Sequence, residues 1–127
     1  MRRPEPTVLV VDDDRDLRES LCEVLTEEGY VARGAADGRE ALEYLRSVEE
    51  LPRLVFLDLM MPRMNGWQFR DAQKADPRIA GIPVAVVTAM GSDTLVRGID
   101  ADLVIRKPPG LDELLDVCRR YLGPASY

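Results

Sequence analysis

The chain has 127 residues, a formal charge of −6 and 46% hydrophobic residues, which indicates a single globular domain with a core of its own. Its acidic balance and its lack of a basic stripe argue against direct binding to nucleic acid. Because the sequence contains no histidine, catalysis by imidazole and metal ligation by histidine are excluded.

The lack of a recognisable targeting signal and the presence of only two cysteines favour a cytoplasmic protein. No apolar run approaches the ~18 residues of a membrane-spanning helix. The first six residues have no apolar segment like that of a secretion signal. Cys22 and Cys118 lie in predicted helices and lack any metal-binding spacing. We expect buried, reduced thiols there, with a disulfide as the alternative.

Strands and helices are predicted to alternate along the chain. Short β-branched apolar runs indicate buried strands, and apolar residues at helical spacing indicate amphipathic helices. In chain order the elements are strand Thr7–Val11, helix Arg15–Glu28, strand Val31–Ala35, helix Arg39–Val48, strand Leu54–Leu57, helix Gly66–Ala75, strand Pro83–Val87, short helix Thr94–Ile99, strand Leu103–Ile105 and helix Leu111–Leu122. This alternation predicts an α/β doubly wound fold, a parallel sheet with helices on both faces.

Polar side chains stand at the predicted ends of four strands. Asp12 and Asp13 follow the first strand, Asp58 the third, Thr88 the fourth and Lys107 the fifth. The carboxyl ends of parallel strands meet at one edge of the sheet, so we expect these residues to converge. Three carboxylates repel one another unless a cation joins them, and Mg²⁺ prefers oxygen ligands. With a lysine charge and a hydroxyl added, the set fits transfer of a phosphoryl group to Asp58.

Each of these residue types has a plainer interpretation as well. An acid after a strand is often a helix N-cap. We expect Asp14 to be one, and for Asp12 and Asp13 taken alone capping remains an alternative. A lone threonine after two valines commonly ends a strand, and a lone Lys-Pro pair commonly lies in a loop. It is the combination of all four positions that favours a phosphoryl site.

Four motifs resemble those of the receiver domain of two-component response regulators. They are Val10–Asp14, Asp58–Gly66, Thr88-Ala89 and Lys107-Pro108, which stand in the order of the family. The segment Asp58–Gly66 is the most specific of them. The resemblance covers essentially the whole chain. It implies one receiver domain over residues 1–127, with a five-stranded flavodoxin-like sheet of strand order 2-1-3-4-5.

The resemblance also implies a function and a set of site residues. A sensor histidine kinase or a histidine phosphotransfer protein would phosphorylate Asp58 in a Mg²⁺-dependent reaction. The aspartyl phosphate would then change a surface that binds a downstream effector protein or domain. Beyond its own phosphorylation and dephosphorylation, the domain would not be an enzyme. Implied Mg²⁺ ligands are Asp12 (largely through water), Asp13, Asp58 and the backbone carbonyl of Met60; implied phosphate contacts are Thr88, Ala89 and Lys107.

The sequence departs from the family after Thr88. Fewer residues than usual separate Thr88 from Lys107, so the helix between them is short. Val104 occupies the switch position, where the family carries an aromatic residue, and Pro109 stands where phenylalanine is common. We expect the phosphorylation chemistry to be retained and the usual coupling to the aromatic residue to be lost. Signalling would then use the backbone of the loop after Thr88, or another face.

Three other functions are compatible with a fold of this kind. One is a docking module that needs no phosphate, but such receivers usually lack Asp13, Asp58 or Lys107. Another is a phosphatase of the haloacid dehalogenase type, which needs a second aspartate where this chain has Met60. The third is a flavodoxin-type flavin protein, whose flavin phosphate the Asp12-Asp13 pair would repel.

Overall fold

The computed structural model describes residues 8–89 and 98–123. These residues form, in chain order, β1 (Val8–Val11), α1 (Arg15–Glu27), β2 (Ala32–Ala35), α2 (Gly38–Ser47), β3 (Val55–Leu57), α3 (Gly66–Lys74), β4 (Val84–Thr88), β5 (Leu103–Arg106) and α5 (Leu111–Leu122). The predicted helix Thr94–Ile99 falls mostly outside the described residues, and its last residue, Ile99, lies in a turn. The other predicted boundaries agree to within one residue. No described helix has both the length and the apolar character needed to cross a membrane.

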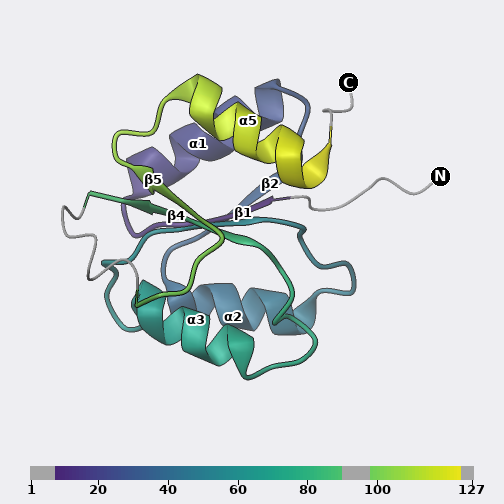
Figure 1. The fold of residues 1–127 in the computed structure, drawn as a ribbon, viewed down its shortest axis with the longest axis vertical. Helices are drawn as coiled ribbons and strands as arrows, with labels where there is room; N and C mark the ends of the chain where they lie inside the picture. The colour runs from purple at the N-terminus through teal and green to yellow at the C-terminus, as the bar shows by residue number, and fades with distance from the viewer. Residues whose placement is uncertain (1–7, 90–97, 124–127) are drawn as a thin grey trace.

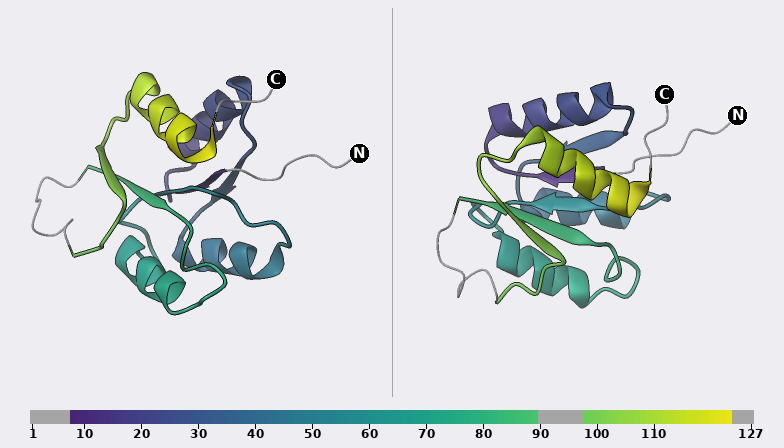
Figure 2. Two further views of the ribbon diagram at one scale, coloured as in Figure 1. Left: turned by 45° about the vertical axis from the view of Figure 1, so that its right-hand side comes forward. Right: turned by 45° about the horizontal axis from the view of Figure 1, so that its top comes forward.

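The five strands form one parallel sheet of order β2-β1-β3-β4-β5, as predicted. Helices α1 and α5 cover one face of this sheet, and α2 and α3 cover the other (Figures 1 and 2). In the register, Val11 lies beside Leu57, and Thr88 lies beside Arg106. The residues that follow these pairs therefore meet at one edge of the sheet.

Two apolar clusters form the core, one on each face of the sheet. Alternate residues of a strand point to opposite faces, so the central strands are buried on both sides and read as continuous apolar runs. The cluster under α2 and α3 includes Leu9, Val11, Val55, Leu57, Val84, Val86 and Phe69. The cluster under α1 and α5 includes Val8, Val10, Leu54, Phe56, Ala85, Val87 and Leu25.

Helix caps fix where α1, α2 and α3 begin at the carboxyl edge of the sheet. The side chain of Asp14 accepts a hydrogen bond from Leu17 N at 3.2 Å, which confirms its predicted capping role. Asp37 caps α2 in the same way through Glu40 N, and Asn65 forms a capping box with Gln68. These caps place each helix directly after the loop that follows a strand end.

Helix α3 buries more polar surface than its sequence predicts. Of its predicted inner face, Phe69 is fully buried, whereas Ala72 is only half-buried. Arg70 and Gln73 are buried beside Phe69. Arg70 Nη1 donates to Gln73 Oε1 at 2.7 Å, and Gln73 Nε2 donates at 3.0 Å to the carbonyls of residues 79 and 82. These hydrogen bonds offset the cost of removing both side chains from water.

The two cysteines are free thiols that differ in burial. Cys118 is a fully buried residue of α5, and this burial raises the pKa of its thiol to about 12. Cys22 is only half-buried, and its burial raises its pKa as well. The prediction of buried thiols therefore holds in full for Cys118 and in part for Cys22.

Candidate functional site

Three carboxylates meet at the carboxyl ends of β1 and β3. Asp12, Asp13 and Asp58 each place an oxygen within 4.8 Å of the others. Asp12 and Asp58 are only 3% and 6% exposed, while Asp13 faces solvent. The sheet brings them together, because Asp58 N donates to Val11 O at 2.9 Å. The acidic cluster predicted from the sequence is therefore present.

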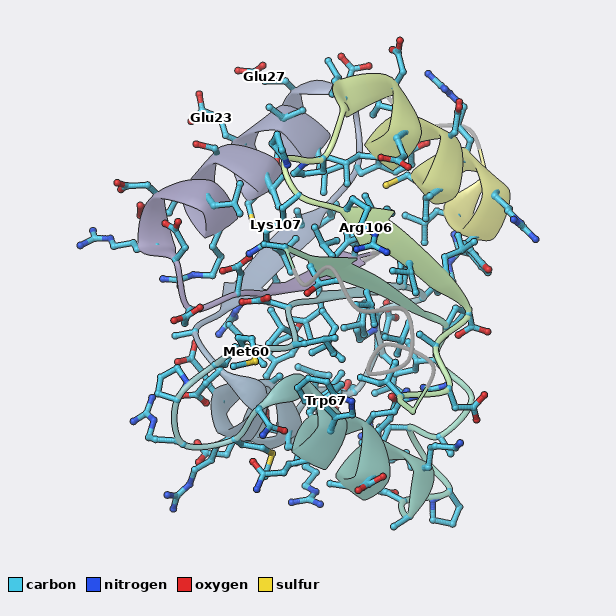
Figure 3. All side chains as sticks on the ribbon, turned by 60° about the vertical axis from the view of Figure 1, so that its left-hand side comes forward. Glu23, Glu27, Met60, Trp67, Arg106 and Lys107 are labelled. Carbon is cyan, nitrogen blue, oxygen red and sulfur yellow. The ribbon has the colours of Figure 1, made fainter. Side chains whose placement is uncertain are left out.

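Lys107 reaches this cluster from the end of β5. Its Nζ lies 2.9 Å from Asp12 Oδ2 and 3.6 Å from Asp58 Oδ1. Its partial burial alone would lower its pKa, but the hydrogen bond to Asp12 and the charges of both carboxylates outweigh that effect and raise it. Figure 3 shows Lys107 and Met60 on either side of the strand ends. Lys107 therefore forms ion pairs with two of the three carboxylates, Asp12 and Asp58.

The surroundings of Asp58 disfavour its ionised form. Its pKa is raised from 3.8 to about 6, first by burial and then by the charge of Asp12. The charge of Lys107 and a hydrogen bond from the backbone N–H of Met60 act in the opposite direction. Its ionised form is therefore costly by itself, and an added cation would favour it.

The remaining predicted site residues lie along the same edge of the sheet. Thr88 is fully buried at the end of β4, and its carbonyl accepts a hydrogen bond from Lys107 N at 3.0 Å. Ala89 follows as an exposed residue, and Met60 is 61% exposed just after β3. Val104 stands apart, because it pairs with Val86 within the sheet and its side chain is 42% exposed.

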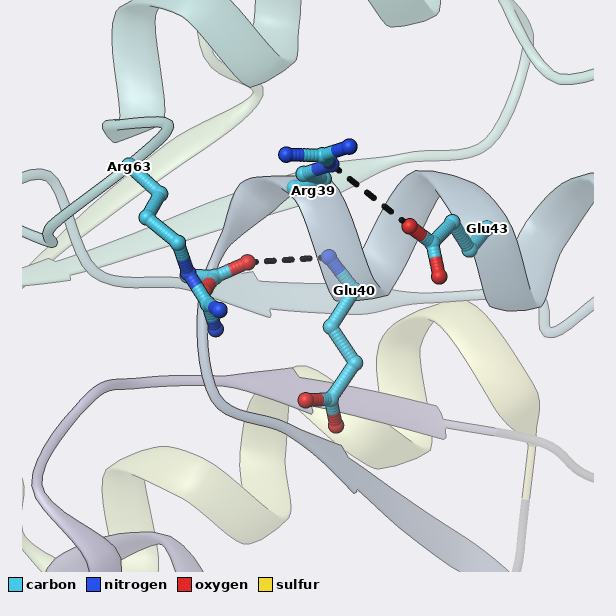
Figure 4. Close-up of a pocket in the computed structure, with 5 residues that line it drawn as sticks. Arg39, Glu40, Glu43 and Arg63 are labelled. Carbon is cyan, nitrogen blue, oxygen red and sulfur yellow. Dashed lines mark hydrogen bonds and ion pairs between the residues drawn. The ribbon is translucent and has the colours of Figure 1, made fainter.

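The loop between β3 and α3 is held from two sides. Gly66 N donates to Leu59 O at 2.9 Å, and a Cβ at Gly66 would lie 2.8 Å from Asp58 O, so only glycine fits there. On the other side, Arg63, labelled in Figure 4, adopts left-handed backbone geometry. It forms an ion pair with the buried Asp37, the N-cap of α2. The Arg63 Nε–Asp37 Oδ2 distance is 2.7 Å. The loop next to Asp58 is therefore braced against α2.

Two charged residues near the site do not stand out in the sequence. Arg63 is one, and Arg18 on α1 is the other, since its Nη1 donates to the backbone carbonyl of Asp12 at 2.8 Å. Long side chains on a helix point toward its N-terminus. An arginine at the start of a helix that follows a strand is therefore aimed back at the strand end, and this geometry is a signal for Arg18.

A sequence model for the response regulator receiver domain matches residues 8–119. The chain belongs to this family. The predicted resemblance and the predicted fold are therefore both confirmed.

Relatives and solved structures of receiver domains agree with this assignment. The chain is 37% identical, over 94% of its length, to the alkaline phosphatase synthesis transcriptional regulatory protein SphR of Synechococcus elongatus. It is 42% identical, over 91% of its length, to the response regulator MprA of Mycolicibacterium vanbaalenii. The matched region is 49% of each of these relatives, so the chain spans about half their length.

Two solved structures superpose closely on this receiver domain. The chemotaxis protein CheY4 of Vibrio cholerae has a TM-score of 0.83 at 28% identity, over 92% of this chain and 98% of that one. The signal receiver domain of a histidine kinase from Syntrophus aciditrophicus has a TM-score of 0.83 at 30% identity, over 92% and 89%.

Proposed function

We propose that this receiver domain accepts a phosphoryl group on Asp58 in a Mg²⁺-dependent reaction. The donor is the phosphohistidine of a sensor histidine kinase or of a histidine phosphotransfer protein. The observation that carries the proposal is the buried carboxylate of Asp58, which lies among Asp12, Asp13 and Lys107 at the end of β3. Membership of the response regulator receiver family supports phosphoacceptor signalling in general.

The residues present fit a Mg²⁺ ion. Asp12, Asp13 and Asp58 offer only oxygen atoms, which suits a hard divalent cation, and their ligand atoms lie within 4.8 Å of one another. Asp13 and Asp58 would bind the ion together with the backbone carbonyl of Met60, and Asp12 would act largely through water. The bound ion supplies positive charge to the transferring phosphoryl oxygens.

Asp58 is the nucleophile in this proposal. One of its carboxylate oxygens bonds to phosphorus as the phosphorus–nitrogen bond of the phosphohistidine breaks, and the imidazole keeps the electron pair of that bond. The attack requires the ionised carboxylate, whose pKa is raised to about 6 by burial and by Asp12. The nearby charge of Lys107 opposes this shift and keeps the ionised form accessible at neutral pH.

Lys107, Thr88 and Ala89 hold the product. Lys107 Nζ turns from the carboxylates to the phosphoryl oxygens, where its positive charge offsets the added negative charge. The hydroxyl of Thr88 and the backbone N–H of Ala89 donate to those oxygens. The hydrogen bond from Lys107 N to Thr88 O keeps the two strand ends in register during this exchange.

The output of the domain is a change at a surface that binds an effector protein or domain. Val104, at the switch position, cannot supply the aromatic ring whose rotation the family uses. The signal therefore leaves the site through the backbone after Thr88, or through another face.

The decisive experiment is intact mass spectrometry after incubation with Mg²⁺ and acetyl phosphate, a small donor that needs no partner protein. We expect the wild type to gain one phosphoryl group, and Asp58→Asn to gain none because amide oxygen is a poor nucleophile. Omission of Mg²⁺ or addition of EDTA should abolish the adduct.

Asp71→Asn is a matched control, since it changes an exposed aspartate on α3 by the same single atom. It should be phosphorylated like the wild type. If the wild type gained no phosphoryl group from acetyl phosphate or from a phosphorylated histidine phosphotransfer protein, the phosphoacceptor proposal would be wrong. The phosphate-independent docking module would then be the better interpretation.

A further inference from the structure

Arg18 contacts the acidic cluster from outside the motifs that define the family. We propose that Arg18 is a positioning residue that fixes Asp12, and with it the loop of residues 12–14, in the conformation that binds the divalent cation. This inference rests on the proposed function of the acidic cluster. It adds a residue that acts through the backbone of Asp12 and touches neither the metal nor the phosphoryl group.

Asp12 is held at each of its polar groups. Its N–H donates to Ala35 O at 3.1 Å, and its Oδ1 accepts from Asp14 N at 2.9 Å. Its Oδ2 faces Lys107 Nζ at 2.9 Å, and its carbonyl accepts from Arg18 Nη1 at 2.8 Å. The proposed reaction draws Lys107 away to the phosphoryl group. Arg18 would then continue to hold the backbone carbonyl of Asp12.

The neighbouring strand leaves room for Arg18. Gly34 lies in β2, and a Cβ built on it would stand 3.0 Å from Arg18 Cδ and 3.1 Å from Arg18 Cγ. Such contacts are tighter than ordinary van der Waals packing, so an alanine at position 34 would push the arginine stem aside. Alanine itself is compatible with a strand conformation. Gly34 therefore gives a means of displacing the Arg18 guanidinium without removing its charge.

The sign of the effect separates positioning from simple electrostatics. A guanidinium near a divalent cation site repels the cation, so removing that charge alone should strengthen Mg²⁺ binding. If Arg18 positions Asp12, removing it should weaken binding, because residues that orient metal ligands typically contribute about 10- to 100-fold to metal affinity. The two roles thus predict opposite changes in the dissociation constant.

The test is calorimetric titration of the full chain with Mg²⁺ at pH 7, supported by thermal unfolding of each variant in EDTA. Arg18→Met keeps an unbranched stem of similar length over Gly34 and removes the donors. We expect it to weaken Mg²⁺ binding about tenfold. Gly34→Ala should weaken binding several-fold, because the displaced guanidinium holds the Asp12 carbonyl less well. In the Arg18→Met background, Gly34→Ala should have no further effect.

Arg15→Met is the matched control, because Arg15 lies on the same helix as Arg18. Among the described residues, Arg15 forms an ion pair only with the exposed Glu19. It removes the same charge near the same loop and should leave Mg²⁺ affinity within about twofold of the wild type.

The outcomes separate this inference from the proposed function. Unchanged or tighter Mg²⁺ binding by Arg18→Met, with binding intact in the wild type, would overturn the positioning role alone. So would independent, additive effects of Gly34→Ala and Arg18→Met. Absence of Mg²⁺ binding in the wild type would overturn the metal-dependent function, and this inference with it.

Discussion

At the scale of single residues, Asp58 combines two properties that oppose each other. It lies at the end of a buried strand, where the sheet fixes its backbone, and its carboxylate is only 6% exposed. Burial and the charge of Asp12 raise its pKa to about 6. A cation that joins such a group favours its ionised form, whereas that ionised form weakens the fold while no cation is bound.

This conflict predicts an unusual pH dependence of stability in metal-free protein. Between pH 4 and pH 6 the folded state retains a proton on Asp58 that the unfolded state, with a pKa near 3.8, has already lost. The folded state therefore binds more protons than the unfolded state. As a result, the contribution of Asp58 to the unfolding free energy falls as the pH rises. Relative to Asp58→Asn, we expect the wild type to lose about 2–3 kcal/mol of unfolding free energy between pH 4 and pH 7.

Urea denaturation of both proteins in EDTA, at intervals of one pH unit, measures this difference. Asp71→Asn should follow the wild-type profile, since Asp71 is exposed. Parallel profiles for the wild type and Asp58→Asn would show that the Asp58 carboxyl group titrates near its ordinary pKa.

At the scale of elements, α3 joins two turns of the chain through buried polar side chains. Gln73 holds the carbonyls of residues 79 and 82 in the turn before β4. Arg70 Nε and Nη2 donate at 3.3 and 3.0 Å to the carbonyl of Asp100, in the turn before β5. Asp100 has a left-handed backbone, which few residues other than glycine adopt. The helix therefore fixes where both strands begin.

Replacing Gln73 with leucine tests this arrangement. Leucine has a similar volume and is more apolar, so transfer free energy alone predicts a gain in stability. We expect a loss of about 2–4 kcal/mol in unfolding free energy, because the carbonyls of residues 79 and 82 and Arg70 Nη1 each lose their hydrogen bond to Gln73. Urea denaturation measures the change. Arg70→Met combined with Gln73→Leu should cost less than the sum of the two single changes. An additive double variant, or a stabilised Gln73→Leu, would contradict the role of this network.

At the scale of the whole molecule, stability should depend on the divalent cation. A ligand that binds only the folded state raises the unfolding free energy by about 2.7 kcal/mol at a free concentration of 100 times its dissociation constant. We expect the wild type and Asp71→Asn to gain this amount with Mg²⁺. Asp13→Asn should gain far less, because it removes a proposed ligand. Thermal unfolding at several Mg²⁺ concentrations measures the gain, and equal gains in all three proteins would show that the cation binds elsewhere.

Apolar sequence patterns predict the strands and their order well, but they predict few of the polar contacts between elements. The buried strands read directly as apolar runs, and their order places Asp12, Asp58, Thr88 and Lys107 at one edge. The same patterns do not reveal Arg63 or Arg70, because a charged residue on a helix or loop looks the same whether it faces water or a partner. Which carbonyl or carboxylate lies within its reach is decided only when distant segments pack. The segment 90–97 lies outside the described residues, so the predicted short helix there stays a prediction.

The ion pair between Lys107 and Asp12 joins residues from nearly opposite ends of the sequence. A nascent chain whose β5 has not yet emerged from the ribosome therefore lacks the lysine that forms an ion pair with Asp12. The same holds for a mature chain whose last strand has detached. In either state the proposed site lacks Lys107, and we expect the aspartyl phosphate to be held only after β5 has paired with β4. The proposed function would therefore require the complete five-stranded sheet.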